Sequence, residues 1–206
     1  MNPIQIGRLL RSGTGGCVVG CRVSEIDAPC FGGMVKIPVQ NDPAYHIYGL
    51  IYDIHIDDDG LVRQLVTAGQ VDEDTIQDNR LNRNVPLEIS VLFIGYAQGN
   101  RLFHLLPPRP PLTLDSIYTC SDDEMAAFTR HGRFGYLRHI LRDDNLPTGE
   151  LLAAHLLACA PVQKRAGHPA WGDEAVQELI SLLRDDYPAL MAVLSALADT
   201  ELYPRS

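Results

Sequence analysis

The chain has 206 residues, of which 46% are hydrophobic and 21% charged, a composition typical of a globular protein with one or two domains. Its 26 acidic and 17 basic residues give a formal net charge of -9. This balance argues against a broad surface for nucleic acid or for an anionic membrane, so direct nucleic-acid binding is not expected. One candidate for a local basic patch is the set Arg130, Arg133, Arg138 and Arg142.

The first half of the chain is predicted to be mainly β-structure, because short β-branched and aromatic runs alternate with glycine- and aspartate-rich turns. The expected strands cover residues 4–10, 17–23, 34–39, 46–56, 86–96 and 102–106. Turns are expected at residues 41–43 and at the acidic run 57–60. The polar segment 61–85, with its acidic cluster at 72–74, is expected to hold a loop and a helical turn. The PPRPP run at 107–111 must be extended, because successive prolines exclude helix.

The second half is predicted to be helical. Ser121 and Glu124 have the spacing of a capping box, which opens a helix reaching to about residue 142. Further helices are expected at 150–160, 173–184 and 188–200, with a linker at 161–172. The predicted fold class is therefore α+β, with a small N-terminal β-barrel over residues 1–115 and a C-terminal helical region over 116–206.

The glycine-rich, acidic and cysteine-containing segments of the sequence match no catalytic or cofactor motif. The glycine-rich stretch 12–20 has no Gly-Lys dipeptide and so does not match a phosphate loop, and the run 57–60 does not continue as a calcium loop. Cys17 and Cys21 have even spacing along an expected strand, which favours buried free thiols over a zinc site with Cys30. We therefore expect no enzyme activity, no metal and no cofactor.

A rival interpretation is a small ligand-binding barrel or an unrecognised enzyme. Its pocket would be lined by side chains of the strongest expected strand: Tyr45, His46, Tyr48 and His55. Because residues two apart on a strand share a face, His46 and Tyr48 are expected to point the same way.

Four short motifs resemble the HerA–ATP synthase barrel, the domain that begins HerA-type DNA-translocating ATPases. They are IGRLLRSG at 6–13, GGMVKIPV at 32–39, YGLIYDIHIDDDG at 48–60 and PPRPPL at 107–112. The resemblance covers about the first 115 residues and implies a bacterial barrel whose role is subunit contact. The ATPase core of that family is not carried over, because no Walker motif follows the barrel.

The first hypothesis is accordingly a cytoplasmic, non-catalytic adaptor for DNA repair. The resemblance implies a HerA-like ATPase or a NurA-like nuclease in DNA-end processing as its partner, and a homo-oligomer is possible. The sequence begins without the pattern of a signal peptide, and no apolar run approaches the roughly 20 residues of a membrane span, so no membrane partner is expected. The candidate interaction residues are Leu179, Leu183, Leu194, Arg133 and Arg138.

The last two expected helices carry apolar stripes that can be satisfied in two ways. They can pair as a helical hairpin that packs on the rest of the chain, or they can present their stripes to a partner. The stripes include Val176, Leu179, Ile180 and Leu183 on one helix, and Leu190, Val193, Leu194 and Leu197 on the next.

Overall fold

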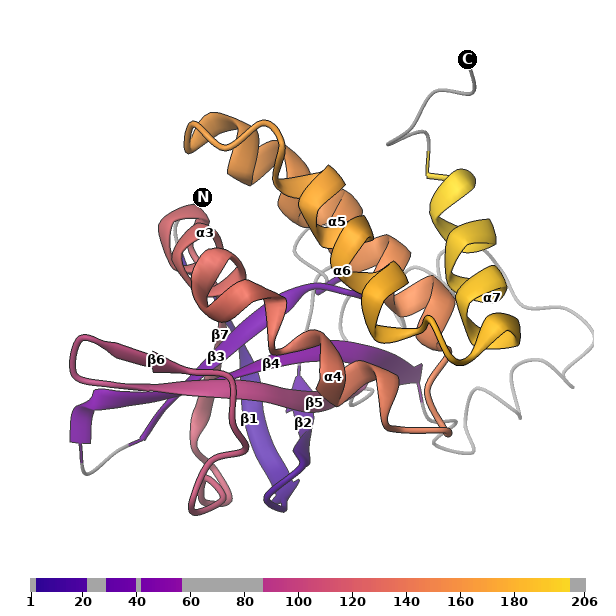
Figure 1. The fold of residues 1–206 in the computed structure, drawn as a ribbon. Helices are drawn as coiled ribbons and strands as arrows, with labels where there is room; N and C mark the ends of the chain where they lie inside the picture. The colour runs from indigo at the N-terminus through magenta and orange to yellow at the C-terminus, as the bar shows by residue number, and fades with distance from the viewer. Residues whose placement is uncertain (1–2, 22–28, 40–41, 57–86, 201–206) are drawn as a thin grey trace, which may run out of the picture.

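The computed structural model describes residues 3–21, 29–39, 42–56 and 87–200. Six antiparallel strands are hydrogen-bonded in the order β2-β1-β7-β3-β4-β5, and β5 pairs back onto β2, so the sheet closes into a barrel (Figure 1). A further short strand, β6, extends β5 as a hairpin. The strands are β1 Gln5–Ser12, β2 Gly16–Cys21, β3 Met34–Val39, β4 Asp42–Ile56, β5 Leu87–Gln98, β6 Arg101–Phe103 and β7 Ser116–Thr119.

Apolar side chains from all six barrel strands fill the barrel interior. β2 alternates strictly, so that Cys17, Val19 and Cys21 point inward while the residues between them are half-buried. The same inner cluster contains Ile6, Leu9, Val35, Ile37, Ile47, Ile51, Ile89, Val91, Phe93 and Ile117. The barrel is therefore a packed core, as expected for so few strands.

The chain after the barrel is helical, with a capping box at its start. Ser121 Oγ accepts from the amide of Glu124, and the Glu124 carboxylate accepts from the amide of Ser121, as the sequence predicts. The helical elements are α3 Asp122–Arg130, the 3₁₀ turn η1 His131–Phe134, α4 Leu137–Leu141, α5 Thr148–Arg165, α6 Trp171–Leu182 and α7 Tyr187–Ala198.

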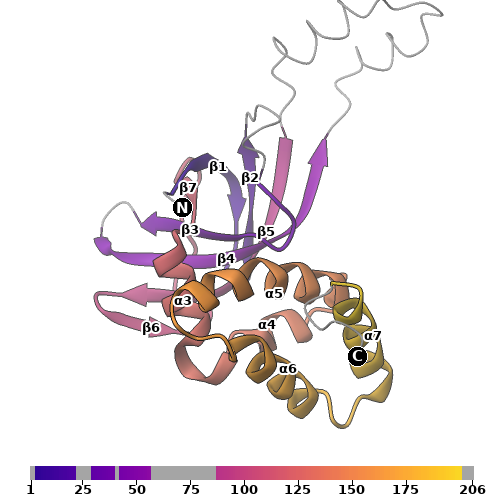
Figure 2. The same cartoon turned by 90° about the horizontal axis from the view of Figure 1, so that it is seen from above.

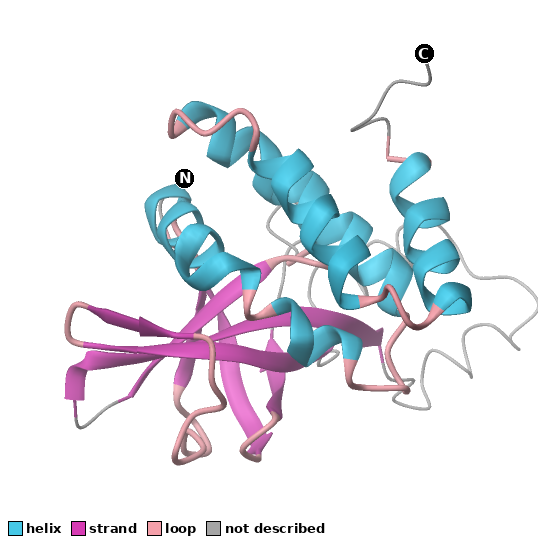
Figure 3. Cartoon of the chain, in the orientation of Figure 1, coloured by secondary structure: helices cyan, strands magenta, loops and turns pink. Residues whose placement is uncertain are grey.

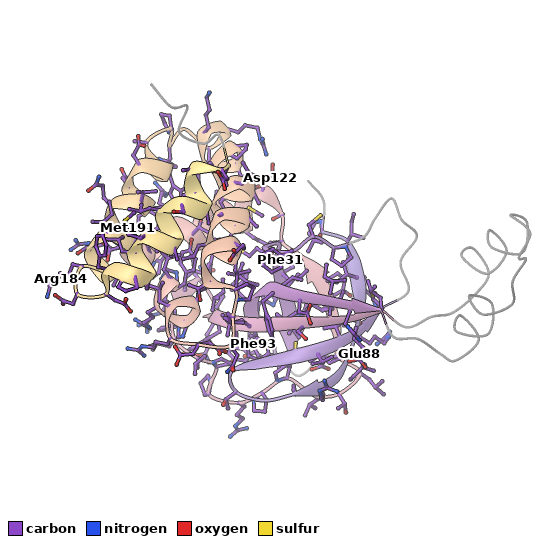
Figure 4. All side chains as sticks on the ribbon, turned by 90° about the vertical axis from the view of Figure 1, so that its right-hand side faces the viewer. Phe31, Glu88, Phe93, Asp122, Arg184 and Met191 are labelled. Carbon is purple, nitrogen blue, oxygen red and sulfur yellow. The ribbon has the colours of Figure 1, made fainter. Side chains whose placement is uncertain are left out.

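The helices cover one outer side of the barrel, formed by strands β3, β4 and β5 (Figures 1 and 2). Met34, Tyr48 and Leu50 point outward from their strands and join Phe128, Tyr136 and Leu152 in a second apolar cluster. Phe31 lies at this junction between barrel and helices (Figure 4). Because β4 and β5 are buried on both faces, the barrel wall and the helical layer share one core.

Two glycines lie where α5 approaches other segments of the chain closely. Gly32 has a φ of +77°, and a Cβ there would lie 2.7 Å from Ala154 Cβ and 2.8 Å from the amide nitrogen of His155 in α5. At Gly149, near the start of α5, a Cβ would lie 3.2 Å from the carbonyl oxygen of Ala192 in α7. Only glycine lets the loop before β3 lie this close to α5.

The structure confirms the α+β fold class with its N-terminal barrel and differs from the expected elements in four places. β7 belongs to the barrel, which therefore extends beyond residue 115 to Thr119. The helix expected over 121–142 is interrupted, because Gly132, Arg133 and Phe134 all have positive φ. α5 continues through Pro161 into the expected linker, held by the buried Cys159 and Val162. β4 begins at Asp42, inside the expected turn.

The turn expected at 57–60, the acidic cluster at 72–74 and the segment 61–85 lie outside the described residues. Among the helices that are described, none combines the length and the apolar character needed to cross a membrane.

Candidate docking site

The loop that joins β6 to β7, residues 104–115, contains the PPRPP run, and we call it the proline loop. It forms no helix or strand, in agreement with the extended path that the prolines predict. Asp115 is buried, and its Oδ2 accepts from the amide of Leu112 at 2.9 Å. Ser12 Oγ donates to the carbonyl oxygen of Pro111 at 2.5 Å, which fixes the loop against the end of β1. The loop is thus a pre-ordered surface feature.

Four leucines of the proline loop are exposed to solvent. The exposed fractions are 53% for Leu105, 45% for Leu106, 63% for Leu112 and 65% for Leu114, and the neighbouring Leu10 of β1 is 47% exposed. The proline loop and the β1–β2 turn extend from the barrel on the side away from α5, α6 and α7 (Figure 3). Apolar side chains that gather on one ordered surface segment are typical of a protein-binding site.

Leu114 is in an unfavourable backbone conformation for an exposed leucine, since its φ is +69°. Glycine or asparagine adopts this region at lower cost than leucine. The amide of Leu114 donates to the carbonyl oxygen of Leu9 at 2.8 Å, and Arg8 Nη1 donates to the carbonyl oxygen of Leu114 at 2.9 Å. These bonds hold the backbone, whereas the side chain gains little burial in return for the strain.

A groove runs beside the proline loop, between the β1–β2 turn, β5 and α4. It consists of two hollows of about 390 Å³ and 830 Å³ that share Gly15, Leu92 and Asp143. Leu105 and Leu106 form one wall of the larger hollow, and Arg138 and Arg142 form part of another. We call this the rim groove. We call the proline loop, Leu10 of β1, the β1–β2 turn and the rim groove together the docking rim.

The docking rim carries five arginines, and among the described residues Arg11 alone of them forms an ion pair, with Glu88 at 3.9 Å. Arg8 and Arg138 donate to backbone carbonyl oxygens, those of Leu114 and His104. Arg109 and Arg142 are exposed. Asp143 and Asp144 also line the groove, but Asp143 accepts from the amide and the Nδ2 of its neighbour Asn145. The five arginines of the docking rim outnumber the two aspartates that line its groove.

The interface between barrel and helices contains the buried polar groups of this region. Tyr136 Oη and His155 Nε2 lie 3.0 Å apart, and both side chains are fully buried. His104 Nε2 donates to the carbonyl oxygen of Phe128 at 3.1 Å, which leaves the unprotonated Nδ1 facing inward. Burial is the main cause that lowers the pKa of His104 and of His155 to about 4. Both histidines are neutral parts of the core near neutral pH.

Three of the predicted interaction residues lie in the helical layer. Leu179 and Leu183 are buried in the core that α6 shares with α5, and Leu194 on α7 is half-buried. A buried leucine contacts a partner only if the layer around it opens, so Leu179 and Leu183 do not form an accessible surface. The apolar stripes of the last two helices are used mainly for internal packing, one of the two alternatives that the sequence left open.

The predicted arginines fall into two separate hollows. Arg138 lines the rim groove with Arg142, whereas Arg133 lines a hollow of about 480 Å³ with Arg130 and with carboxylates of α6. The four arginines of the expected basic patch therefore line two hollows, two in each. Arg138 belongs to the docking rim and Arg133 does not.

Two residues of the rival pocket, Tyr45 and Tyr48, lie on opposite sides of β4. Tyr48 is buried against Phe128 on the helix-covered side, with ring centroids 4.7 Å apart. Tyr45 packs on the opposite side of the strand against Tyr96, with ring centroids 5.6 Å apart.

Cys17 and Cys21 are buried free thiols, and burial raises their pKa to about 12 and about 11. Cys30, by contrast, is exposed.

The sequence analysis did not find the exposed leucines of the docking rim, because it used PPRPPL only as an extended segment and as one of the motifs of the family resemblance. A signal was present: four leucines at 105, 106, 112 and 114 flank a run that can form neither helix nor strand. Without a regular element, such residues have no periodic face to bury. No protein-family model matches the chain, and a comparison with curated proteins finds no similar sequence.

Proposed function

We propose that this protein is a non-catalytic adaptor that docks onto a larger partner through the docking rim. The observation that carries the proposal is the set of exposed leucines on the ordered proline loop. In the rest of the described chain most apolar side chains of the strands and helices are buried in the core, and Leu157, Leu182, Tyr187 and Met191 are exposed on the helices. A surface that is both apolar and rigid loses little conformational entropy on binding, which favours a docking role.

The partner that we propose is a HerA-like ATPase or a NurA-like nuclease, on the basis of the short motifs that resemble the HerA–ATP synthase barrel. The closed antiparallel barrel is compatible with that resemblance, and many other barrels share its architecture. The adaptor would act in the cytoplasm of a bacterium, in DNA-end processing.

Co-purification tests this proposal. The full chain is produced with a HerA-like ATPase and a NurA-like nuclease from the same organism, and each is tagged in turn. A stable complex with either protein is the expected result. If both partners are well folded and neither retains the chain at micromolar concentration, the proposal loses its named partners.

A further inference from the structure

The chemistry of the docking rim indicates what kind of segment it binds. We infer that the docking rim binds an acidic, leucine-rich segment of a partner protein, with apolar side chains on the proline loop and carboxylates at Arg109 and Arg142. This inference deepens the proposed function and rests on it for the role of the site. The expected ligand is a protein segment, and the experiment below distinguishes it from a nucleic acid.

The first argument is charge complementarity. The chain as a whole is acidic, with a formal net charge of -9, yet the docking rim gathers Arg8, Arg109, Arg138 and Arg142. None of the four has a carboxylate within ion-pair distance among the residues that the structure describes. The fifth arginine of the docking rim, Arg11, pairs with Glu88. Outside the rim, Lys36, Arg165 and Arg184 each form an ion pair with a carboxylate of the chain, whereas none is described for Arg130 and Arg133.

The second hollow that contains arginines provides an internal comparison. Arg130 and Arg133 line it together with Asp173, Glu174 and Glu178, so the chain itself supplies acidic groups there. The second hollow therefore has three carboxylates for two arginines, whereas the rim groove is lined by three arginines and by the two carboxylates of Asp143 and Asp144. A carboxylate supplied by a partner would therefore add more at the docking rim than at the second hollow.

The leucines argue for a protein segment over nucleic acid. Non-specific sites for single strands combine positive charge with exposed aromatic rings on which bases stack. The exposed large side chains of the proline loop are Leu105, Leu106, Leu112 and Leu114, which offer apolar contact without a ring. Apolar contacts of this kind match the leucine-like side chains of a protein, while the arginines fix its register.

Leu114 adds an argument that does not depend on charge. Its φ of +69° and its exposure of 65% mean that folding alone would favour glycine or asparagine at this position. Strained residues on a well-anchored loop are found at binding sites, where a side chain is needed in a fixed place. The leucine is thus explained by contact with an apolar group of a partner.

The test is a selection of short random peptides displayed on phage against the immobilised full chain. We expect the enriched peptides to combine aspartate or glutamate with leucine-like residues, and synthetic copies of them to bind the wild-type chain in solution. The double variant Arg109→Gln/Arg142→Gln should weaken this binding at least tenfold. The matched control Arg130→Gln/Arg133→Gln, in the second hollow, should leave it unchanged.

Leu112→Ser/Leu114→Asn should weaken binding as strongly, with Leu157→Ser, an exposed leucine of α5, as its control. The inference is overturned if no peptide is enriched, if basic peptides are, or if both arginine pairs matter equally. It is also overturned if a labelled single-stranded oligonucleotide binds through Arg109 and Arg142 at about 0.15 M salt while the peptides do not.

This experiment separates the inference from the proposed function. If a HerA-like ATPase co-purifies with the rim variants as well as with the wild-type chain, the adaptor role stands and the assignment of the rim fails. If acidic peptides bind through the rim but neither named partner is retained, the rim assignment stands and the named partners fail.

Discussion

The helix-covered side of the barrel and the docking rim differ in how their apolar and charged side chains are satisfied. On the helix-covered side, apolar groups are buried on both faces of β4 and β5, and Tyr136 and His155 are hydrogen-bonded to each other. On the docking rim, leucines are exposed, and four of the five arginines lack a carboxylate partner among the described residues. The helical region thus completes the core, whereas the leucines of the docking rim are covered by neither the barrel nor the helices.

Removing the helices should have the largest effect, because it exposes the outer faces of β3, β4 and β5. A chain ending at Cys120 keeps all six barrel strands but exposes Met34, Tyr48 and Leu50. We expect it to be insoluble or unfolded, as judged by circular dichroism and proton NMR. A soluble fragment with dispersed amide resonances would show that the barrel is an independent unit and would break the comparison.

Gly32→Ala should have the next largest effect. The new Cβ would lie 2.7 Å from Ala154 Cβ, and alanine is disfavoured at the observed φ of +77°. Together the clash and the backbone strain should lower the free energy of unfolding by about 2–5 kcal/mol in urea denaturation. The matched control is Gly13→Ala, since nothing lies within 4 Å of a Cβ at Gly13. Equal stability of the two variants would contradict the close approach of the loop to α5.

Acidification should destabilise the helix-covered side. The folded pKa of His104 and of His155 is about 4, below the ordinary value of 6.5, so the unfolded chain binds more protons between these values. The free energy of unfolding is therefore unaffected by these two histidines above pH 6.5. It falls as the pH falls from 6.5 towards 4, by about 1.4 kcal/mol per pH unit for each histidine. Urea denaturation at several pH values measures this slope, and His155→Gln should flatten it. A slope that His155→Gln leaves unchanged would assign the effect to other groups.

Leu114→Asn should have the smallest effect, and its sign is the informative part. Asparagine tolerates the left-handed conformation better than leucine, so the free energy of unfolding should rise by about 0.5–1 kcal/mol or stay equal. Thermal unfolding followed by circular dichroism gives the comparison with the wild-type chain. A clear loss of stability would mean that the Leu114 side chain supports the fold, which removes one argument for the docking rim.

The sequence predicts the strand-rich and helix-rich halves well, because β-branched runs, the Ser121 capping box and helical apolar spacing are local signals. It does not predict that the helices cover the barrel, since this depends on long-range packing of Tyr48 on Phe128. The sequence did hold one hint. The runs Ile47–Ile51 and Val91–Ile94 do not alternate between apolar and polar residues, which is typical of strands covered on both faces, and both runs are buried in the structure.

The candidate site was harder to predict for two physical reasons. Leu179 and Leu183 have the pattern of an amphipathic face, and the sequence alone does not say whether that face meets the chain or a partner. The docking rim joins Leu10, Arg142 and the proline loop, which are distant along the chain. Arg138 was found because it lies in a recognisable cluster of arginines, but its separation from Arg133 follows from the interruption at Gly132.

The central claim is that the docking rim binds a partner and the helix-covered side holds the fold. The most direct measurement is the amount of co-purified HerA-like ATPase retained by Leu112→Ser/Leu114→Asn, compared with the thermal midpoint of the same variant. We predict that most of the retained ATPase is lost while the midpoint stays within a few degrees of the wild-type value. Full retention of the ATPase by this variant, or loss of retention only together with unfolding, would contradict the claim.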